Sequence, residues 1–259
     1  MPDQTLAPSK LTRDDGATIA YHHTPGKSPG VMFLTGFKSD MMGSKALALE
    51  AHCMAHGLAF TRFDYYGHGQ SSGAFEDGTI GRWAEDTVMV LDQITTGPQM
   101  LVGSSMGGWI MLLAALARPD RVAGLLGVAA APDFTRDLIP PALTPEQLAD
   151  LDKQGFCEIP NCYDDQQPYV IRKSLLDEGD NHLLLGGEIA LDVPVRLIHG
   201  VKDEDVPWET ALKIMERLKS DDVEVQFVKN GDHRLSEDHD LARLTRTFDA
   251  LKEAVDRAN

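Results

Sequence analysis

The sequence predicts an α/β fold in which a mostly parallel central sheet is flanked by helices. Three observations support this fold class. Short apolar runs of strand length alternate with longer segments of helical period along the chain. Turns rich in glycine and polar residues follow several of these runs, and 259 residues suit a single large domain. Strands that alternate with helices are joined by right-handed crossovers, which make the strands parallel.

The individual elements follow from their residue patterns. The first strand, ATIAYH, mixes polar and apolar residues as in an exposed hairpin, whereas the later strands are short apolar runs typical of a buried sheet. Strands are expected at residues 17–22, 31–35, 58–63, 99–102, 122–129, 194–198 and 223–228. Helices are expected at residues 44–56, 80–95, 109–117, 208–218 and 237–254, with Gly57 and Pro119 as stop signals for two of them.

The interval 132–190 breaks the alternation of strands and helices. It contains Pro140 and Pro141, and we expect helical pieces in it at 145–153 and 168–179. We interpret it as a small helical cap insertion that folds over the edge of the sheet. Residues 1–131 and 191–259 then form the core, and the whole chain is one structural domain.

The composition is that of an acidic globular protein. The formal net charge is −16, from 40 acidic and 24 basic residues, and such a surface repels phosphate backbones and anionic lipid headgroups. We therefore expect neither nucleic acid nor a membrane as a partner, and the sequence gives no indication of the oligomeric state. The first residues, MPDQTLAPSKLTRDDG, lack the apolar region of a secretory signal, so we expect a cytoplasmic location.

The three cysteines are Cys53, Cys157 and Cys162. An odd and low number argues against a disulfide framework and fits a reducing compartment. Cys157 and Cys162 are close in sequence, but no second pair of cysteines or histidines at ligand spacing accompanies them. We expect ordinary thiols there and no metal site.

A G-x-S-x-G motif at 103–107 is the strongest sign of chemistry. An apolar strand precedes it and an apolar helix follows it, which is the context of a nucleophile elbow. Ser105 is the candidate nucleophile, because centring the motif on Ser104 would require glycine where the chain has valine and methionine. The alternative is a glycine-rich turn that serves only tight packing.

A serine nucleophile needs a general base and an acid that orients it. In folds with this elbow the chain order is serine, acid, histidine. The turn after the strand at 194–198 contains Asp203, Glu204 and Asp205, and their position alone does not choose among them. His233 follows the last strand and precedes the closing helix, as a base should.

Two of the other histidines, His68 and His199, flank turns on the same side of the sheet and stay in reserve as alternatives. An oxyanion formed at the serine also needs N–H donors. We expect the backbone N–H groups of Met106, next to the nucleophile, and of Phe37, in the loop after the strand at 31–35. Apolar residues of the insertion are candidates for an acyl-chain pocket or, equally, for packing onto the core: Phe134, Leu138, Ile139, Leu143 and Phe156.

Taken together, the segments TGF, FDYYGHGQSSG, GSSMGGW, HGVKDEDVPW and GDHR resemble the α/β-hydrolase family. The resemblance spans residues 31–234 and implies the α/β-hydrolase fold. In the family pattern HG-x-x-D-x-x-V-P the aspartate is the acid, which here is Asp203. Within the family, these segments resemble the branch of mitochondrial acyl-protein thioesterases and acyl-glucuronide esterases.

The resemblance implies a serine hydrolase that cleaves carboxylic esters or thioesters of small-molecule or acylated substrates through an acyl-enzyme. This chemistry needs no metal and no organic cofactor. A general carboxylesterase or a serine aminopeptidase is the alternative enzyme. A non-catalytic ligand-binding protein on the same fold is the alternative of a different class. Labelling of Ser105 by a fluorophosphonate distinguishes the enzymes from the binding protein.

Overall fold

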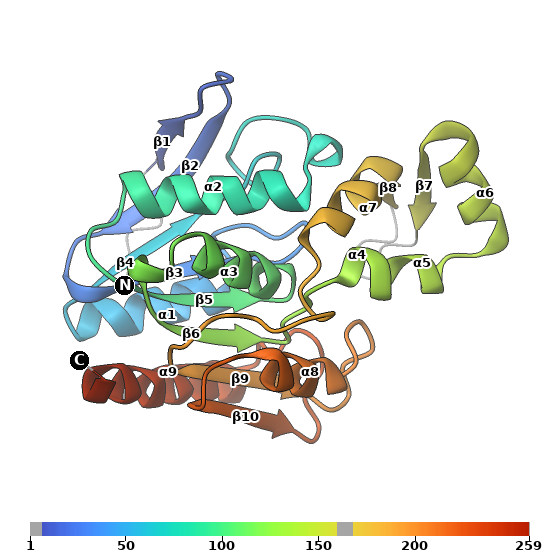
Figure 1. Ribbon diagram of the computed structural model, residues 1–259. Helices are drawn as coiled ribbons and strands as arrows, with labels where there is room; N and C mark the ends of the chain where they lie inside the picture. Colours follow the sequence, from blue (N-terminus) through green and yellow to red (C-terminus); the bar gives the residue numbers. More distant parts are fainter. Residues whose placement is uncertain (1–6, 160–167, 259) are drawn as a thin grey trace.

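An eight-stranded sheet lies at the centre of the protein in the computed structural model, which describes residues 7–159 and 168–258 (Figure 1). The strands are β1 (Ser9–Thr12), β2 (Thr18–Thr24), β3 (Lys27–Leu34), β4 (Leu58–Phe63), β5 (Gln99–Ser104), β6 (Val122–Val128), β9 (Val195–Gly200) and β10 (Val223–Val228). Their order across the sheet is β1-β2-β4-β3-β5-β6-β9-β10. The pairs β1–β2 and β2–β4 are antiparallel, and every later pair is parallel. The predicted mostly parallel sheet is confirmed.

Helices cover both faces of this sheet. They are α1 (Ser44–Ala55), α2 (Ile80–Gln93), α3 (Met106–Ala117), α8 (Glu209–Arg217) and α9 (Asp238–Ala258). Buried residues of α1 and α9 share one apolar cluster, and those of α2, α3 and α8 share the other. Among the described residues, no helix combines the length and the apolar character that a bilayer crossing requires.

Strand β3 illustrates why the central strands are apolar throughout. Its Val31 and Phe33 belong to the cluster with α1 and α9, whereas Met32 and Leu34 belong to the cluster with α2 and α3. Successive side chains of a strand point to opposite faces, so a strand with helices on both sides needs apolar residues at every position.

The segment between β6 and β9 lies beyond the carboxyl ends of the strands, at the right of Figure 1. It contains α4 (Phe134–Asp137), α5 (Ile139–Ala142), α6 (Pro145–Gln154), β7 (Phe156–Ile159), β8 (Tyr169–Arg172) and α7 (Lys173–Gly179). The segment also contains the short 3₁₀ helix η3 (Asp180–His182). Two further 3₁₀ helices lie outside it, at η1 (Phe75–Asp77) and η2 (Pro119–Arg121). The segment therefore lies where it can cover the edge of the sheet at which the candidate site residues are expected.

The helix expected at 168–179 is wrong in its first part. Residues Tyr169–Arg172 form β8, which pairs antiparallel with β7, and the helix begins only at Lys173. Tyr, Val and Ile favour a strand once a partner is present, and this pairing buries Ile171 beside Cys157. A helical pattern is read from neighbouring residues alone, and it cannot indicate the pairing with β7.

Asp133 joins the two ends of the inserted segment. It follows β6 in a left-handed backbone conformation, with φ 61°, and its side chain is fully buried. Oδ1 accepts a hydrogen bond from the backbone N–H of Leu184 at 2.8 Å, and Oδ2 accepts one from Leu185 at 2.8 Å. One carboxylate thus fixes the exit of the insertion to its entrance.

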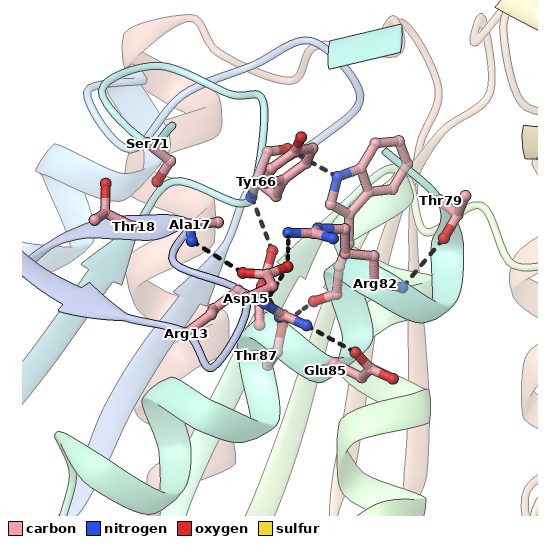
Figure 2. Close-up of polar contacts among 12 residues, drawn as sticks. Arg13, Asp15, Ala17, Thr18, Tyr66, Ser71, Thr79, Arg82, Glu85 and Thr87 are labelled. Carbon is pink, nitrogen blue, oxygen red and sulfur yellow. Dashed lines mark hydrogen bonds and ion pairs between the residues drawn. The ribbon is translucent and has the colours of Figure 1, made fainter. Parts of the chain in front are cut away.

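A second buried carboxylate, Asp86 of α2, anchors the amino-terminal hairpin. Figure 2 shows Arg13, Tyr66, Arg82 and Glu85, which surround it. Asp86 accepts hydrogen bonds from the guanidinium of Arg13 and, at 2.8 Å, from the backbone N–H of Tyr66. Arg13 also pairs with Glu85 at 2.9 Å, and Arg82 stacks on the Tyr66 ring at 3.7 Å. Burial raises the pKa of Asp86 to about 6, although the Tyr66 N–H and Arg13 oppose this rise.

Replacing Arg13 by methionine should lower the free energy of unfolding by about 3 kcal/mol at pH 8, because it leaves a buried carboxylate without its cation. The folded pKa of Asp86, about 6, lies above the ordinary value of 3.8, so between these pH values the folded state binds more protons than the unfolded state. The contribution of Asp86 to stability therefore falls as the pH rises through this range. Loss of Arg13 raises the folded pKa further, so the deficit should be larger at pH 8 than at pH 5.

Urea unfolding of both proteins at the two pH values measures this effect. Arg118→Met is the matched control, because Arg118 pairs with Asp92 at the surface and such pairs contribute at most about 1 kcal/mol. Equal losses for the two arginine variants would contradict the anchoring role of Arg13.

Candidate active site

Ser105 stands at the turn between β5 and α3. Its backbone has φ 54° and ψ −121°, a conformation that non-glycine residues rarely adopt. A Cβ on Gly103 would overlap the carbonyl oxygen of Gly107, and a Cβ on Gly107 would overlap that of Leu34. Both glycines of the motif are therefore required by close backbone contacts, and the turn they permit raises Ser105 above the sheet.

The structure brings Ser105, His233 and Asp203 into one hydrogen-bonded line. Ser105 Oγ lies 3.0 Å from His233 Nε2, and His233 Nδ1 lies 2.8 Å from Asp203 Oδ2. A proton on Nδ1 donates to the carboxylate, which leaves the lone pair of Nε2 free to accept the serine O–H. The geometry is that of an activated serine, and the catalytic role of the three residues stays a prediction.

Asp203 and His233 are held near each other by the loops that follow β9 and β10. Within these loops, the backbone N–H of Lys202 donates to the carbonyl of Gly231 at 2.9 Å. These strands are adjacent and parallel, so their carboxyl ends meet at the same edge of the sheet as the elbow. The side chain of Asp203 is 0% exposed, whereas that of His233 is 16% exposed.

Four hydrogen bonds satisfy the carboxylate of Asp203. Oδ1 accepts the backbone N–H groups of Asp205 and Val206 at 2.9 and 2.8 Å, and Oδ2 accepts from His233 and from His199. Burial alone would raise the pKa of Asp203, but the two histidines and the backbone donor of Val206 bring it well below its ordinary value. Asp203 is therefore ionised at neutral pH.

The neighbouring acids do not occupy this position. Glu204 and Asp205 are exposed. Asp203, Asp205 and His233 bring ligand-type atoms within 4.8 Å of one another, but the hydrogen bond between His233 and Asp203 already accounts for that proximity. The described residues therefore give no separate reason to place a metal here.

The predicted oxyanion donors flank the nucleophile. Met106 is the first residue of α3, so its N–H has no acceptor within the helix, and it follows Ser105 directly. Gly36 packs against the other side of Ser105, because a Cβ added to Gly36 would lie 3.4 Å from the Cβ of Ser105. Within the described part of the chain, the N–H of Phe37 donates to no protein acceptor. Both N–H groups stay predicted donors.

An aromatic cluster surrounds the Phe37 ring. Its centroid lies 4.8 Å from that of Phe75, 5.7 Å from Phe134 and 6.2 Å from Tyr169, each in edge-on geometry. The ammonium of Lys38 lies over the rings of Phe75 and Tyr169. Sequence reasoning missed Phe75, Tyr169 and Lys38, because they come from three separate segments and carry no shared motif.

The five predicted pocket residues lie in different environments. Leu143 packs against the small apolar cluster inside the insertion. Phe134 is buried between Phe37 and Trp109, and Leu138 and Ile139 are half-buried against the main core. Phe156 is 38% exposed on β7. Phe134 therefore borders the oxyanion loop directly, and a pocket lined by all five residues stays a prediction.

The two alternative histidines and the cysteines lie in different environments. His68 is buried among the rings of Tyr65, Phe75 and Trp83, and this burial lowers its pKa to about 4. Cys157 is buried against Leu151, with its pKa raised by burial, and Cys162 lies outside the described residues. His199, in contrast, contacts the carboxylate of Asp203 directly.

A cavity of about 270 Å³ lies between β9, β10 and α9, away from the three residues of the site. Arg196, Arg243 and Arg246 line it. Two of these arginines have carboxylate partners, since Arg196 pairs with Asp222 at 2.7 Å and Arg243 with Asp240 at 2.6 Å. The cavity therefore has no strong excess of positive charge with which to hold an anion.

The chain is similar to several known proteins. The family model Hydrolase_4, described as serine aminopeptidase S33, matches residues 30–150. The mitochondrial palmitoyl-protein thioesterase ABHD10 of Bos taurus is 42% identical over 248 residues, which cover 94% of this chain and 79% of that protein.

Two solved structures are similar over nearly their whole length. The α/β hydrolase domain-containing protein 10 from mouse has a TM-score of 0.88 and 41% identity, covering 96% of this chain and 99% of that chain. A protein from Agrobacterium vitis S4 that is assigned as a hydrolase has a TM-score of 0.90 and 38% identity, covering 97% and 99%.

The predicted cytoplasmic location is wrong. The curated relatives that are 42% identical over most of the chain are mitochondrial proteins, which points to a mitochondrial rather than a cytoplasmic location. The prediction relied on the first residues and on the low number of cysteines, and neither determines the compartment of a protein.

Proposed function

Because the chain belongs to the ABHD10 thioesterase family of the α/β-hydrolases, we propose that it removes long acyl chains from thioesters through an acyl-enzyme on Ser105. Family membership confirms the predicted α/β-hydrolase fold and makes the chain a hydrolase of ester or thioester bonds. The observation that carries the mechanism is the hydrogen-bonded line from Ser105 through His233 to Asp203.

The first half of the proposed cycle forms the acyl-enzyme. Ser105 Oγ attacks the acyl carbonyl carbon while His233 Nε2 accepts its proton, and the carbonyl oxygen becomes an oxyanion held by the N–H groups of Phe37 and Met106. Asp203 stabilises the imidazolium that forms on His233. The carbon–sulfur or carbon–oxygen bond then breaks, and His233 returns the proton to the departing thiol or alcohol.

The second half releases the acid. Water attacks the acyl carbon of the acyl-enzyme, and His233 takes a proton from that water. A second tetrahedral intermediate collapses, the bond to Ser105 Oγ breaks, and His233 gives the proton back to the serine. The free carboxylic acid leaves, and the site returns to its starting protonation.

The substrate is an acyl thioester in this proposal for two reasons. The related proteins are named palmitoyl-protein thioesterases, and the aromatic cluster of Phe37, Phe75, Phe134 and Tyr169 supplies apolar surface beside the nucleophile. We infer that the insertion, residues 132–190, acts as a cap on this side. The partner is then an acylated protein or small molecule, with no role for nucleic acid.

A substrate panel tests this specificity. We expect kcat/KM to rise with acyl length from two to sixteen carbons, since each buried CH₂ contributes about 0.8 kcal/mol. S-palmitoyl peptide should be cleaved, and leucine p-nitroanilide should not. The background for every substrate is measured with Ser105→Ala.

The outcomes of the panel separate the candidate functions. A flat or falling chain-length profile would reject the long-chain pocket. Turnover of the aminoacyl amide would favour a serine aminopeptidase, the activity described for the matched family model. A chain that neither turns over any substrate nor reacts with a fluorophosphonate would be a binding protein on the same fold.

A further inference from the structure

A second histidine contacts the carboxylate of the proposed triad. His199 is a residue of β9, and its side chain is 1% exposed. Its Nε2 lies 3.1 Å from Asp203 Oδ2 and 3.0 Å from the backbone carbonyl of Val206. The ring therefore bridges the two ends of the loop that holds the acid.

The neighbours of His199 define its protonation state. Both atoms close to Nε2 are acceptors, so Nε2 carries a proton that the two acceptors share. Nδ1 is buried, and no partner for it lies among the described residues. A charged ring would place a second N–H there without an acceptor, which is costly in a buried site, so the ring is neutral.

Asp203 Oδ2 thus accepts hydrogen bonds from two imidazoles at once, His233 and His199. We propose that His199 is a positioning residue whose N–H lowers the attraction of Asp203 for a charged His233, so that His233 stays neutral and ready to act as a base. The proposal rests on the proposed function, because it takes Ser105, His233 and Asp203 as the catalytic set.

A merely structural role does not account for this arrangement. Oδ1 of Asp203 already accepts two backbone N–H groups, which fix the carboxylate without help from His199. A donor on Oδ2 instead withdraws negative charge from the one oxygen that faces His233. Removal of that donor should leave Asp203 in place and strengthen its hold on an imidazolium.

Other charged groups lie near His233 in space or in sequence. Asp205 brings its carboxylate within 4.8 Å of ligand-type atoms of His233 and Asp203. From α1, Lys45 donates to the carbonyl of Arg234 at 2.5 Å, and Asp232 and Arg234 flank the histidine in sequence. These groups are unchanged in variants of His199, so a shift in such variants reports on His199 alone.

The test compares His199→Phe, which keeps a ring without a donor, with His199→Gln, whose amide nitrogen replaces Nε2. The measurement is the pH profile of kcat/KM for an acyl thioester. In His199→Phe the acidic limb should move to higher pH by about 0.5 to 1 unit, a loss of about 3- to 10-fold below the limb. The plateau at high pH should stay within about 3-fold of the parent, because the triad itself is intact. His199→Gln should keep the parent profile.

Asp205→Asn gives the opposite sign, because loss of a nearby negative charge destabilises the imidazolium and moves the limb to lower pH. His199→Leu is made in parallel in case the phenylalanine variant does not fold, and fluorophosphonate labelling confirms an intact Ser105 in each. An unmoved or lowered limb in folded variants, or the same shift in His199→Gln, would overturn the role of His199 alone. A parent protein without labelling or turnover would overturn the proposed function instead.

Discussion

Replacing Ser105 by alanine should lower kcat for ester and thioester substrates by a factor on the order of 10⁴ to 10⁶. Oγ of Ser105 is the atom that forms the covalent bond, and it lies 3.0 Å from the nitrogen that receives its proton. Without it the oxyanion donors and the apolar site remain, so slow attack by water is all that is left. Stopped assays with a long acyl thioester measure the loss, and mass spectrometry shows whether a fluorophosphonate still adds to the chain.

Ser104→Ala is the matched control for this experiment. Ser104 is the neighbouring residue, the last of β5, and among the described residues its hydroxyl makes no hydrogen bond to His233. It should keep turnover within a few-fold of the parent and react with the fluorophosphonate at Ser105. Near-normal activity in Ser105→Ala, or full loss in Ser104→Ala, would show that the nucleophile has been misassigned.

Replacing Asp203 by asparagine should lower kcat by about 10⁴-fold while leaving the fold intact. The backbone N–H groups of Asp205 and Val206 donate to Oδ1, so the amide oxygen of asparagine must take that place. Its NH₂ group then faces His233 Nδ1, which has to accept a hydrogen bond. The imidazole proton moves to Nε2, where it points at Ser105 and prevents the ring from acting as a base.

Two controls distinguish this mechanism from unfolding. Circular dichroism of Asp203→Asn should match that of the parent, and Glu204→Gln, which changes the exposed neighbouring acid, should retain activity within a few-fold. If Glu204→Gln lost as much activity as Asp203→Asn, the acid would have to be reassigned.

The core of the fold was accessible from the sequence because its signals are local. The apolar run at 58–63 coincides with β4, and the run at 223–228 coincides with β10. The elbow was equally visible, since two glycines and a serine at fixed spacing are needed wherever a strand turns sharply into a helix. The choice of Asp203 over Asp205 required the family pattern, because both lie in the same turn.

Other features depend on partners that are distant in sequence. Residues 169–172 form a strand only because β7 lies beside them. The cluster around Phe37 gathers rings from a strand–helix loop, a 3₁₀ turn and the insertion. His199 is the histidine of the HG-x-x-D pattern, so the sequence identifies the residue. Its contact with Asp203 Oδ2 depends on the conformation of a loop, which no residue pattern describes.

The carboxylate of Asp133 has a consequence for how the protein can diverge. Its hydrogen bonds to Leu184 and Leu185 hold the two ends of the inserted segment together. The residues between Asp133 and Leu184 can therefore change in sequence and length without moving these ends. Under the proposed function, insertions, deletions and new side chains in this segment would change which acyl groups are accepted, while Ser105, His233 and Asp203 keep their alignment. Substrate preference can thus change in evolution while the site residues keep their positions.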